Sequence, residues 1–386
     1  MGDIIAAADE LLAAATAAVA RRAERLPALP AGSDAFWGDS PDGYDAFFVA
    51  GGGLPWPYPD HRMEGAAWMD LAARWKRLRR TRPSGAMAAG RGALLDRLRR
   101  ASASNAGGSG PIASRREASR NWSGAILGAR EGCRFTAVTA RWRVPDAAES
   151  APGAPAPIEG AFAGEPLSRR VSVWIGLDGH RDIAGSLPQI GTTTAEMFRD
   201  GRRWVETYAW AQWWVLGGNY GEVVFTDFAV RPGDEVACWL ALHSPERVVM
   251  SIRNETRGTE DSVAWQSGPI PAGGGRADLM QLHARPAPVD GMAAVWCVER
   301  PTVMGRTDKY PLPDFGQVEF RDCIAGGSRQ GPHDALRYAA VDMLRTLDQP
   351  RLVSMTDRRG TPCCARRIAV PDRGAARDRL VVQYRG

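Results

Sequence analysis

The sequence predicts an all-β fold, an antiparallel β-sandwich preceded by a basic helical segment. From residue 121 onward, short runs rich in Val, Trp, Tyr, Phe and Thr alternate with turns of Gly, Pro and Asp. Many short strands at this spacing are typical of a sandwich. The composition also changes sharply near residue 115, and 386 residues suffice for one large β domain with an additional segment.

Three segments in the N-terminal part have the composition of helices. In the first, Ala and Leu dominate and Pro27 and Pro30 follow, which favours a helix that ends before them. The other two are rich in Arg and Lys. The expected helices are 3–26, 62–80 and 86–100, with an irregular loop rich in Gly, Pro and aromatic residues at 31–60.

A flexible linker is expected at residues 101–115, which read ASASNAGGSGPIASR. It divides the chain into a helical, basic leader at 1–115, a possible propeptide, and a β-sandwich domain at 116–386. The expected strands of this domain are Phe135–Val144, Val171–Leu177, Trp204–Val215, Val223–Val230, Glu235–Leu242, Val248–Asn254, Ala293–Val298, Gln317–Phe320 and Leu380–Tyr384.

Charge and hydropathy limit the classes of partner. The net charge is +5, and residues 74–100 hold ten Arg or Lys against one acid, Asp96. A basic patch can meet nucleic acid or membrane, but no nucleic-acid motif and no interleaved aromatic residues accompany it, so we expect no nucleic-acid partner. No run of 18 apolar residues occurs, so we expect no transmembrane helix. The N-terminus does not resemble a secretory signal, and the compartment stays open.

The sequence gives no pattern for a metal or cofactor site. Its five His residues are scattered without zinc-protease spacing, and its six Cys residues form no CxxC pair. We therefore expect no metal and no cofactor. The sequence allows one disulfide, between Cys323 and either Cys363 or Cys364.

Two short blocks 110 positions apart carry the most specific signal: Leu187-Pro188-Gln189-Ile190-Gly191 and Trp296-Cys297-Val298-Glu299. Further blocks run around them in order: Asn121-Trp122-Ser123-Gly124, Val173-Trp174-Ile175-Gly176-Leu177-Asp178-Gly179, Tyr208-Ala209-Trp210-Ala211-Gln212-Trp213-Trp214, Pro232-Gly233-Asp234, Asn254-Glu255-Thr256-Arg257-Gly258 and Phe315-Gly316-Gln317-Val318-Glu319-Phe320. In this order, over about residues 119–325, the chain resembles the glutamic peptidase (eqolisin) family. The resemblance implies a concanavalin A-like sandwich and an endopeptidase.

The resemblance implies that Gln189 and Glu299 are catalytic. A carboxyl group can take a proton from water and return it to the leaving amine. A side-chain amide can stabilise the developing oxyanion and stays neutral in acid. Alternation places Glu299 on one face with Cys297 and Val295, and such apolar neighbours raise the pKa of a carboxyl group. From pattern alone, Gln189 would be a turn residue and Glu299 a strand-end partner of Arg300.

Further positions match residues that line or brace the substrate cleft in that family: Trp122, Trp174, Asp178, Trp210, Gln212 and Trp214. Their other interpretation is core packing, with Asp178 as a turn residue. The sequence departs from the family at Gln212, where a Glu is typical, at Trp214, where a Tyr is usual, and at Val295, where many members carry Glu. The loss of a carboxylate at Gln212 alters the electrostatic field on Glu299.

Two functions follow from these observations. The first is an endopeptidase that hydrolyses polypeptides at acid pH through a water activated by Gln189 and Glu299, acting as a monomer and regulated by its leader. The second is a non-catalytic β-sandwich that binds carbohydrate or peptide on a Trp-lined concave face. In the second, both residues would hydrogen-bond ligand hydroxyl groups.

Overall fold

The fold was analysed in a computed structural model whose regular elements, in the part described, are all strands. The described residues are 54–55, 116–129, 133–147, 155, 167–180, 185–215, 222–225, 228–267, 280–283, 288–302, 309–329, 343–347, 349–357, 359–369 and 378–385. The helices and the linker predicted for the leader lie outside these residues. No helix in the described part is long and apolar enough to span a membrane.

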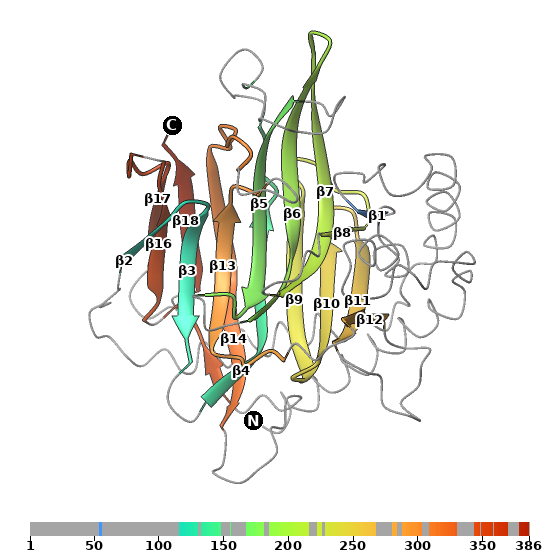
Figure 1. The fold of residues 1–386 in the computed structure, drawn as a ribbon, viewed down its shortest axis with the longest axis vertical. Helices are drawn as coiled ribbons and strands as arrows, with labels where there is room; N and C mark the ends of the chain where they lie inside the picture. The colour runs from blue at the N-terminus through green and yellow to red at the C-terminus, as the bar shows by residue number, and fades with distance from the viewer. Residues whose placement is uncertain are drawn as a thin grey trace, which may run out of the picture.

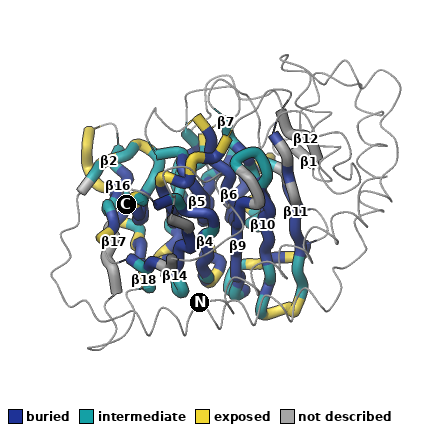
Figure 2. Tube along the Cα trace, turned by 90° about the horizontal axis from the view of Figure 1, so that it is seen from below, coloured by how far each residue is buried: buried dark blue, intermediate teal, exposed yellow. Residues whose placement is uncertain are grey.

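Two mostly antiparallel sheets stack face to face, as Figures 1 and 2 show from two directions. The sheet that carries the candidate site is called the front sheet. Its strand order is β1 (Leu54–Pro55), β8 (Val223–Val224), β7 (Arg202–Val215), β6 (Ser186–Arg199), β5 (Leu167–Leu177), β13 (Ala293–Glu299), β3 (Trp122–Gly128), β16 (Arg351–Met355) and β2 (Arg116–Ser119). All of its pairs are antiparallel except β16 with β2, at one edge.

The second sheet, called the back sheet, has one parallel pair, β11 with β12. Its order is β12 (Met280–His283), β11 (Thr259–Ser267), β10 (Arg247–Asn254), β9 (Glu235–Ser244), β4 (Cys133–Arg143), β14 (Gln317–Arg329), β18 (Arg379–Tyr384) and β17 (Cys364–Ala369), with β15 (Met343–Arg345) also paired to β14. This arrangement confirms the predicted all-β sandwich.

Alternation along the front strands produces two separate apolar clusters. Residues on the inner face join the main core between the sheets. Two buried indoles bridge that core: Trp296 Nε1 donates to the carbonyl of Thr139 at 3.0 Å, and Trp142 Nε1 donates to Thr192 Oγ1 at 3.1 Å. Each spans from one sheet to the other, so the polar ends of these large side chains are satisfied within the core.

The second cluster covers the outer face of the front sheet. It comprises Ile126, Trp174, Leu187, Trp210, Ala293, Val295, Cys297 and Val353, with Trp122, Tyr208 and Trp214 packed against it. All of its members come from front-sheet segments, and most of them are less than a twentieth exposed. A sheet face buried away from the main core needs a cover or a function, and this face carries the candidate site.

The strand predictions succeeded where apolar runs are long and failed where they are interrupted. Predicted Val223–Val230 contains only the two-residue β8. The 14-residue β6 was not predicted, because Pro188 and Gly191 interrupt its pattern and Thr192 to Thr194 follow without alternation. A central strand normally excludes Pro. Strands β3, β11, β16 and β17 were not predicted either, but β6 is the one that carries Gln189.

Gly191 is required by close packing in the front sheet. A Cβ at this position would lie 2.1 Å from the carbonyl oxygen of Val173 and 2.6 Å from Trp174 Cβ. We expect Gly191→Ala to lower the free energy of unfolding by about 1–3 kcal/mol, the usual cost of overpacking. Urea denaturation checks this, with Gly128→Ala as the matched control because no atom lies within 4 Å of a Cβ there. Equal stability of the two variants would contradict the prediction.

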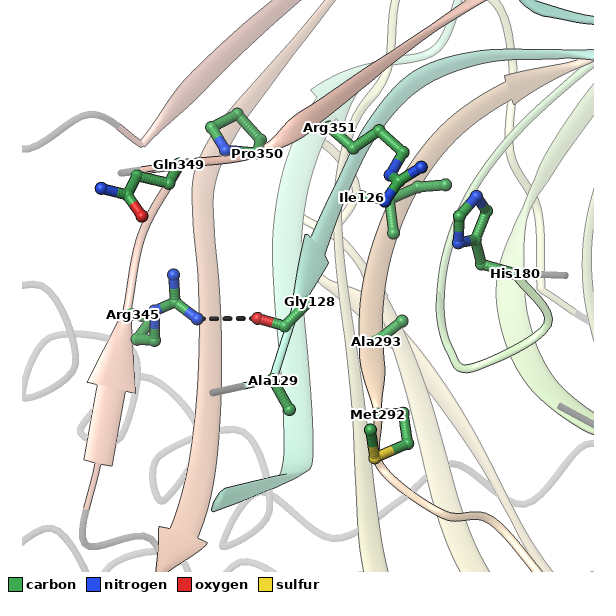
Figure 3. Close-up of a pocket in the computed structure, with 10 residues that line it drawn as sticks. All are labelled: Ile126, Gly128, Ala129, His180, Met292, Ala293, Arg345, Gln349, Pro350 and Arg351. Carbon is green, nitrogen blue, oxygen red and sulfur yellow. Dashed lines mark hydrogen bonds between the residues drawn. The ribbon is translucent and has the colours of Figure 1, made fainter. Parts of the chain in front are cut away.

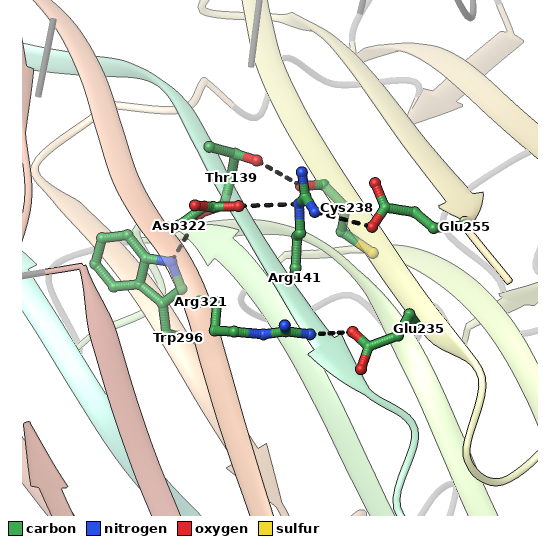
Figure 4. A network of polar contacts seen from close by, with 8 residues as sticks. All are labelled: Thr139, Arg141, Glu235, Cys238, Glu255, Trp296, Arg321 and Asp322. Atoms are coloured by element: carbon green, nitrogen blue, oxygen red, sulfur yellow. Dashed lines mark hydrogen bonds and ion pairs between the residues drawn. The ribbon is translucent and has the colours of Figure 1, made fainter. Parts of the chain in front are cut away.

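The back sheet carries a polar network that is separate from the candidate site (Figure 4). Arg141 contacts Glu255 at 3.1 Å and Asp322 at 2.9 Å, and Arg321 pairs with Glu235. These side chains are partly exposed, so each pair contributes little to stability. Their positions on β4, β9 and β14 tie neighbouring strands together and give no ligand-binding geometry.

All six cysteines are free thiols, so the disulfide that the sequence allows is not formed. Cys323 and Cys364 both lie in the main core, and Cys363 packs against it. Burial raises the pKa of the Cys323 thiol well above its ordinary value, which keeps it neutral and apolar in character. The free thiols act as small hydrophobic side chains in this structure.

Candidate active site

Strand register places the candidate residues in three parallel rows on the outer face of the front sheet. The first row holds Trp122, Glu299, Ser172, Thr193 and Tyr208, which are successive Cα partners. The second row holds Gly124, Cys297, Trp174, Gly191 and Trp210, and the third holds Ile126, Val295, Gly176, Gln189 and Gln212. Two positions separate consecutive rows, so their side chains share one face.

Glu299 lies at the end of β13 and accepts a hydrogen bond on each carboxylate oxygen. Trp174 Nε1 donates to Oε2 at 2.8 Å, and Asn121 Nδ2 donates to Oε1 at 2.8 Å. The indole of Trp122 packs edge-on against Trp174, with ring centroids 5.1 Å apart. The alternative interpretation, a pairing of Glu299 with Arg300, is not seen, since Arg300 Nη2 donates to the carbonyl of Arg120.

Burial raises the pKa of the Glu299 carboxyl above its ordinary value, as the sequence predicted. The hydrogen bonds from Trp174, Asn121 and Trp122 act in the opposite direction, and the charge of Lys309 adds to them. Burial dominates because the surrounding rings exclude water from a charged group. A carboxyl group with a raised pKa can both accept a proton from water and return it to a leaving group.

Gln189 lies on β6 in the row that also holds Gln212. Its Nε2 donates to Gln212 Oε1 at 2.6 Å, so the two amides are locked together. Gln189 is only 5% exposed, and its Oε1 has no hydrogen-bond partner among the described residues. A buried, unpaired amide oxygen is costly unless a ligand or water satisfies it. Gln189 therefore offers an unsatisfied acceptor to whatever occupies the outer face.

The row of Trp174 and Trp210 lies between the rows of Glu299 and Gln189. Trp174 is fully buried and Trp210 is 2% exposed, with Trp210 Nε1 donating to Thr193 Oγ1 at 2.9 Å. Trp122 and Trp214 are partly buried and pack on the same cluster. The structure thus brings together on one face every predicted site residue except Asp178.

Asp178 lies at the end of β5, where its carboxylate binds the backbone before β13. Its Oδ2 accepts from the amide of Gly291 at 2.8 Å, and its Oδ1 accepts from those of Met292 and Ala293 at 2.6 and 3.1 Å. The side chain is 1% exposed and its φ is 64°. These contacts give Asp178 a bracing role; direct contact with substrate stays a prediction.

Sequence reasoning missed three polar residues of this face: Asn121, Tyr208 and Glu222. Asn121 opens one of the motif blocks, which was the available signal. Tyr208 also lay within a block but had no assigned role. Glu222 is in a Gly-rich stretch without any pattern, and only the structure shows that Tyr208 Oη donates to its Oε1 at 2.8 Å.

A second hollow lies on the same face beyond the start of β13, with a volume of about 410 Å³ (Figure 3). Its cationic side chains already have partners. Glu117 accepts from Arg351 Nη1 at 2.8 Å and lies 3.1 Å from His180 Nε2, while Arg345 Nη1 donates to the carbonyl of Gly128 at 2.8 Å. In the described residues no group of three His, Cys, Asp or Glu is arranged to hold a metal ion.

Comparison with known structures gives matches to glutamic peptidases. Scytalido-glutamic peptidase, solved with a transition state analog inhibitor, is 17% identical, with 69% of this chain and 98% of that chain covered and a TM-score of 0.46. SCP-B, a member of the eqolisin family, is 17% identical over 69% and 98% of the chains, with a TM-score of 0.44. Aspergilloglutamic peptidase from Aspergillus niger is 17% identical over 56% and 99%, with a TM-score of 0.39.

A comparison with curated protein sequences gives no significant match. A family model described as the Peptidase A4 family matches residues 120–358, which include Gln189, Glu299 and the rows between them. Because this match spans more than half of the 386 residues, the chain belongs to the Peptidase A4 family, the glutamic peptidases or eqolisins.

Proposed function

We propose that this protein is an endopeptidase that cleaves polypeptides with a water activated by Glu299 and Gln189. The observation that carries the proposal is the shared outer face, where a carboxyl group with a raised pKa and an unsatisfied amide oxygen flank a row of indoles. Membership of a peptidase family supports the class of reaction.

Glu299 is the general base in this mechanism. As a carboxylate it takes a proton from the attacking water, and the water oxygen bonds to the scissile carbonyl carbon. The same carboxyl group then gives the proton to the leaving amine, as microscopic reversibility of acid–base catalysis allows. Trp174 and Asn121 hold its two oxygens, so the carboxyl group keeps one orientation through both steps.

Gln189 positions water and stabilises the oxyanion. One of its amide hydrogens is used on Gln212, which leaves a second hydrogen for the substrate carbonyl. Its unpartnered Oε1 can accept a hydrogen bond from the attacking water. Pairing with Gln212 fixes the amide in place, so little reorganisation is needed when charge develops.

The pH dependence follows from Glu299. Its carboxyl group must be ionised to accept a proton, so kcat/KM falls as the pH drops below its pKa, which burial has raised. Gln212 contributes no charge where a Glu is typical of the family. The absence of that charge lowers the pKa of Glu299, so it opposes the effect of burial, which moves the acid limit of activity to higher pH.

The alternative binding function is less well supported by the indoles. A sugar platform needs exposed ring faces, whereas Trp174 and Trp210 are almost fully buried and Trp122 packs edge-on against Trp174. Buried rings that brace a carboxylate fit a catalytic role better than a stacking surface. We therefore place the rings in support of Glu299, with substrate contact left to the partly buried Trp122 and Trp214.

The leader would act as a propeptide in this proposal. One short leader segment, β1, pairs with β8 at the edge of the front sheet, next to β7. A segment in that place can limit access to the outer face until it is removed. Cleavage within the linker at 101–115 should then increase activity at neutral pH, and equal activity before and after cleavage would contradict the propeptide role.

The test is cleavage of a denatured protein by the full chain from pH 2 to 9, with Gln189→Ala alongside. We expect the variant to lose about 10²–10³-fold in kcat, the usual effect of one oxyanion donor. Chelators, thiol reagents and pepstatin-type inhibitors should have no effect on the wild type. Absence of cleavage by folded wild type, with or without the leader cut off, would overturn the proposed function and make a glycan-binding screen the next experiment.

A further inference from the structure

The outer face holds a second carboxyl group, Glu222, that the mechanism above does not use. It lies directly before β8, next to Tyr208 at the far end of the first row, in which Glu299 is the second residue. Glu222 is partly buried and its charge interacts with that of Glu299. Two carboxyl groups that interact through a dry surface tend to share a proton, because both cannot be ionised cheaply.

A row of hydroxyl groups crosses the sheet between these two carboxyl groups. Tyr208 Oη donates to Glu222 Oε1 at 2.8 Å and is also hydrogen-bonded to Thr193. Thr193 Oγ1 lies 2.7 Å from Ser172 Oγ. Ser172 is the direct cross-strand partner of Glu299, and such partners have Cβ atoms about 4.5–5.5 Å apart.

We propose that Glu222 is a second proton-holding group of this active site, connected to Glu299 by the hydroxyls of Ser172, Thr193 and Tyr208. The proposal rests on the proposed function. The two carboxyl groups share one proton: the O–H bond on Glu299 breaks and one forms on Glu222, so Glu299 becomes a carboxylate and Glu222 a neutral acid. The hydroxyls of Tyr208, Thr193 and Ser172 form the polar row that leads from Glu222 to the cross-strand neighbour of Glu299.

The consequence for catalysis is a free carboxylate at Glu299 at the start of each cycle. While Glu222 holds the proton, Glu299 can accept another from the attacking water. Glu222 does not touch the reacting atoms in this scheme. It acts through Glu299, by holding the proton that would otherwise neutralise that carboxylate. It also supplies a carboxyl group to a site in which Gln212 replaces the Glu that is typical of the family.

The surroundings of the pair support this assignment. Burial raises the pKa of Glu222 to about 7, although the hydrogen bond from Tyr208 and the charge of Arg170 lower it and the charge of Glu299 raises it. Burial also raises the pKa of Tyr208 well above its ordinary value, so its hydroxyl stays protonated at rest. Around Glu299, Lys309 is the opposing charge, and the buried thiol of Cys297 is neutral.

The test compares kcat/KM against pH for the wild type, Glu222→Gln and Tyr208→Phe. We expect the wild type to show a transition near pH 7 in addition to that of Glu299, and Glu222→Gln to lose it. Tyr208→Phe should move this transition to higher pH, because the hydrogen bond that stabilises the Glu222 carboxylate is gone. Glu206→Gln is the matched control, since its carboxylate contacts Trp204 on the same strand and should leave the profile unchanged.

Stability gives a second readout that does not require activity. In the folded chain Glu222 binds a proton up to about pH 7, whereas a free Glu releases it near pH 4.5. The folded state thus binds more protons in this window, and wild-type stability should fall as the pH rises through it, less so in Glu222→Gln.

The two readouts separate the possible failures. An active wild type with the same pH profile as both variants would overturn the proton-holding role while leaving the proposed function intact. If the wild type cleaves nothing, the proposed function fails, and ¹³C-carboxyl titration in Glu-labelled protein still tests the coupling. In that case the Glu222 resonance should titrate at lower pH in Glu299→Gln, because the repelling charge is gone, and an unchanged titration would overturn the inference.

Discussion

Glu299→Gln should reduce kcat/KM by about 10²–10⁴-fold, the range expected when a general acid–base group is removed. The variant keeps the size of the side chain and one carbonyl oxygen that can accept from Trp174 or Asn121. It loses the capacity to take and return a proton, together with one of the two acceptor oxygens. The measurement is hydrolysis of a fluorogenic peptide at the wild-type pH optimum, with circular dichroism to show that the fold is retained.

Glu319→Gln serves as the control for this variant. Glu319 is a partly exposed carboxylate on β14 of the back sheet, 3.7 Å from Arg379, and should be dispensable for catalysis. Retention of more than a tenth of the activity by Glu299→Gln would show that another group is the base. A comparable loss in both variants would point to general damage and not to a missing proton acceptor.

The loss in Glu299→Gln should exceed that in Gln189→Ala above the pKa of Glu299, where the wild type holds the ionised base. In the proposed mechanism Gln189 stabilises charge that water or the amide of Gln212 can partly stabilise in its place. Among the described residues, no neighbouring group can replace Glu299 as a base without moving, because Cys297 is neutral and Glu222 lies across the row of hydroxyls. The ratio of the two effects therefore distinguishes proton transfer from electrostatic stabilisation.

The sequence predicted the sandwich and singled out the candidate pair Gln189 and Glu299, for different physical reasons. Runs such as Ala293–Val298 are long and apolar, so they identify strands whatever their neighbours are. Glu299 could be placed on a face with Val295 and Cys297 because alternation is local. Gln189 depended on resemblance to a family, since a Pro and a Gly conceal the strand that carries it.

The rest of the site depends on register, which no local pattern contains. The approach of Asn121 to Glu299 joins residues 178 positions apart, and Glu222 approaches the row from a Gly-rich segment. Pairing of β5, β6, β7 and β13 sets which side chains become neighbours, and that pairing follows from packing of the whole sheet. The contacts of Asp178 with residues 291–293 also depend on this pairing, so sequence alone assigned Asp178 to a turn or to the cleft.

Asp178→Ala should lower the free energy of unfolding by at least about 3 kcal/mol, since each of the three buried donors left unpaired costs about 1–3 kcal/mol. The carboxylate accepts from three backbone amides, those of Gly291, Met292 and Ala293. Alanine also has to adopt a φ of 64° at this position, which adds about 1 kcal/mol. Chemical denaturation monitored by Trp fluorescence measures the total.

Asp200→Ala separates the backbone effect from the hydrogen bonds. Asp200 has a φ of 51° in an exposed turn, so its replacement should cost only about 1 kcal/mol. Asp178→Gly, which removes the carboxylate without backbone strain, should remain close to Asp178→Ala. If Asp178→Gly were as stable as the wild type, the three amide contacts would not be the source of stability.

Loss of the Asp178 contacts with the backbone should also affect the candidate active site. Asp178 holds the backbone that enters β13 against the end of β5, and the register of these two strands places Trp174 beside Glu299. A loosened entry to β13 would weaken the indole contact on the carboxylate, and a carboxyl group that loses a donor has a higher pKa. Asp178→Asn, which retains a single acceptor oxygen, should therefore shift the acid limb of the kcat/KM profile to higher pH while the protein stays folded. An unshifted limb would confine Asp178 to stability and leave the orientation of Glu299 to Trp174 and Asn121 alone.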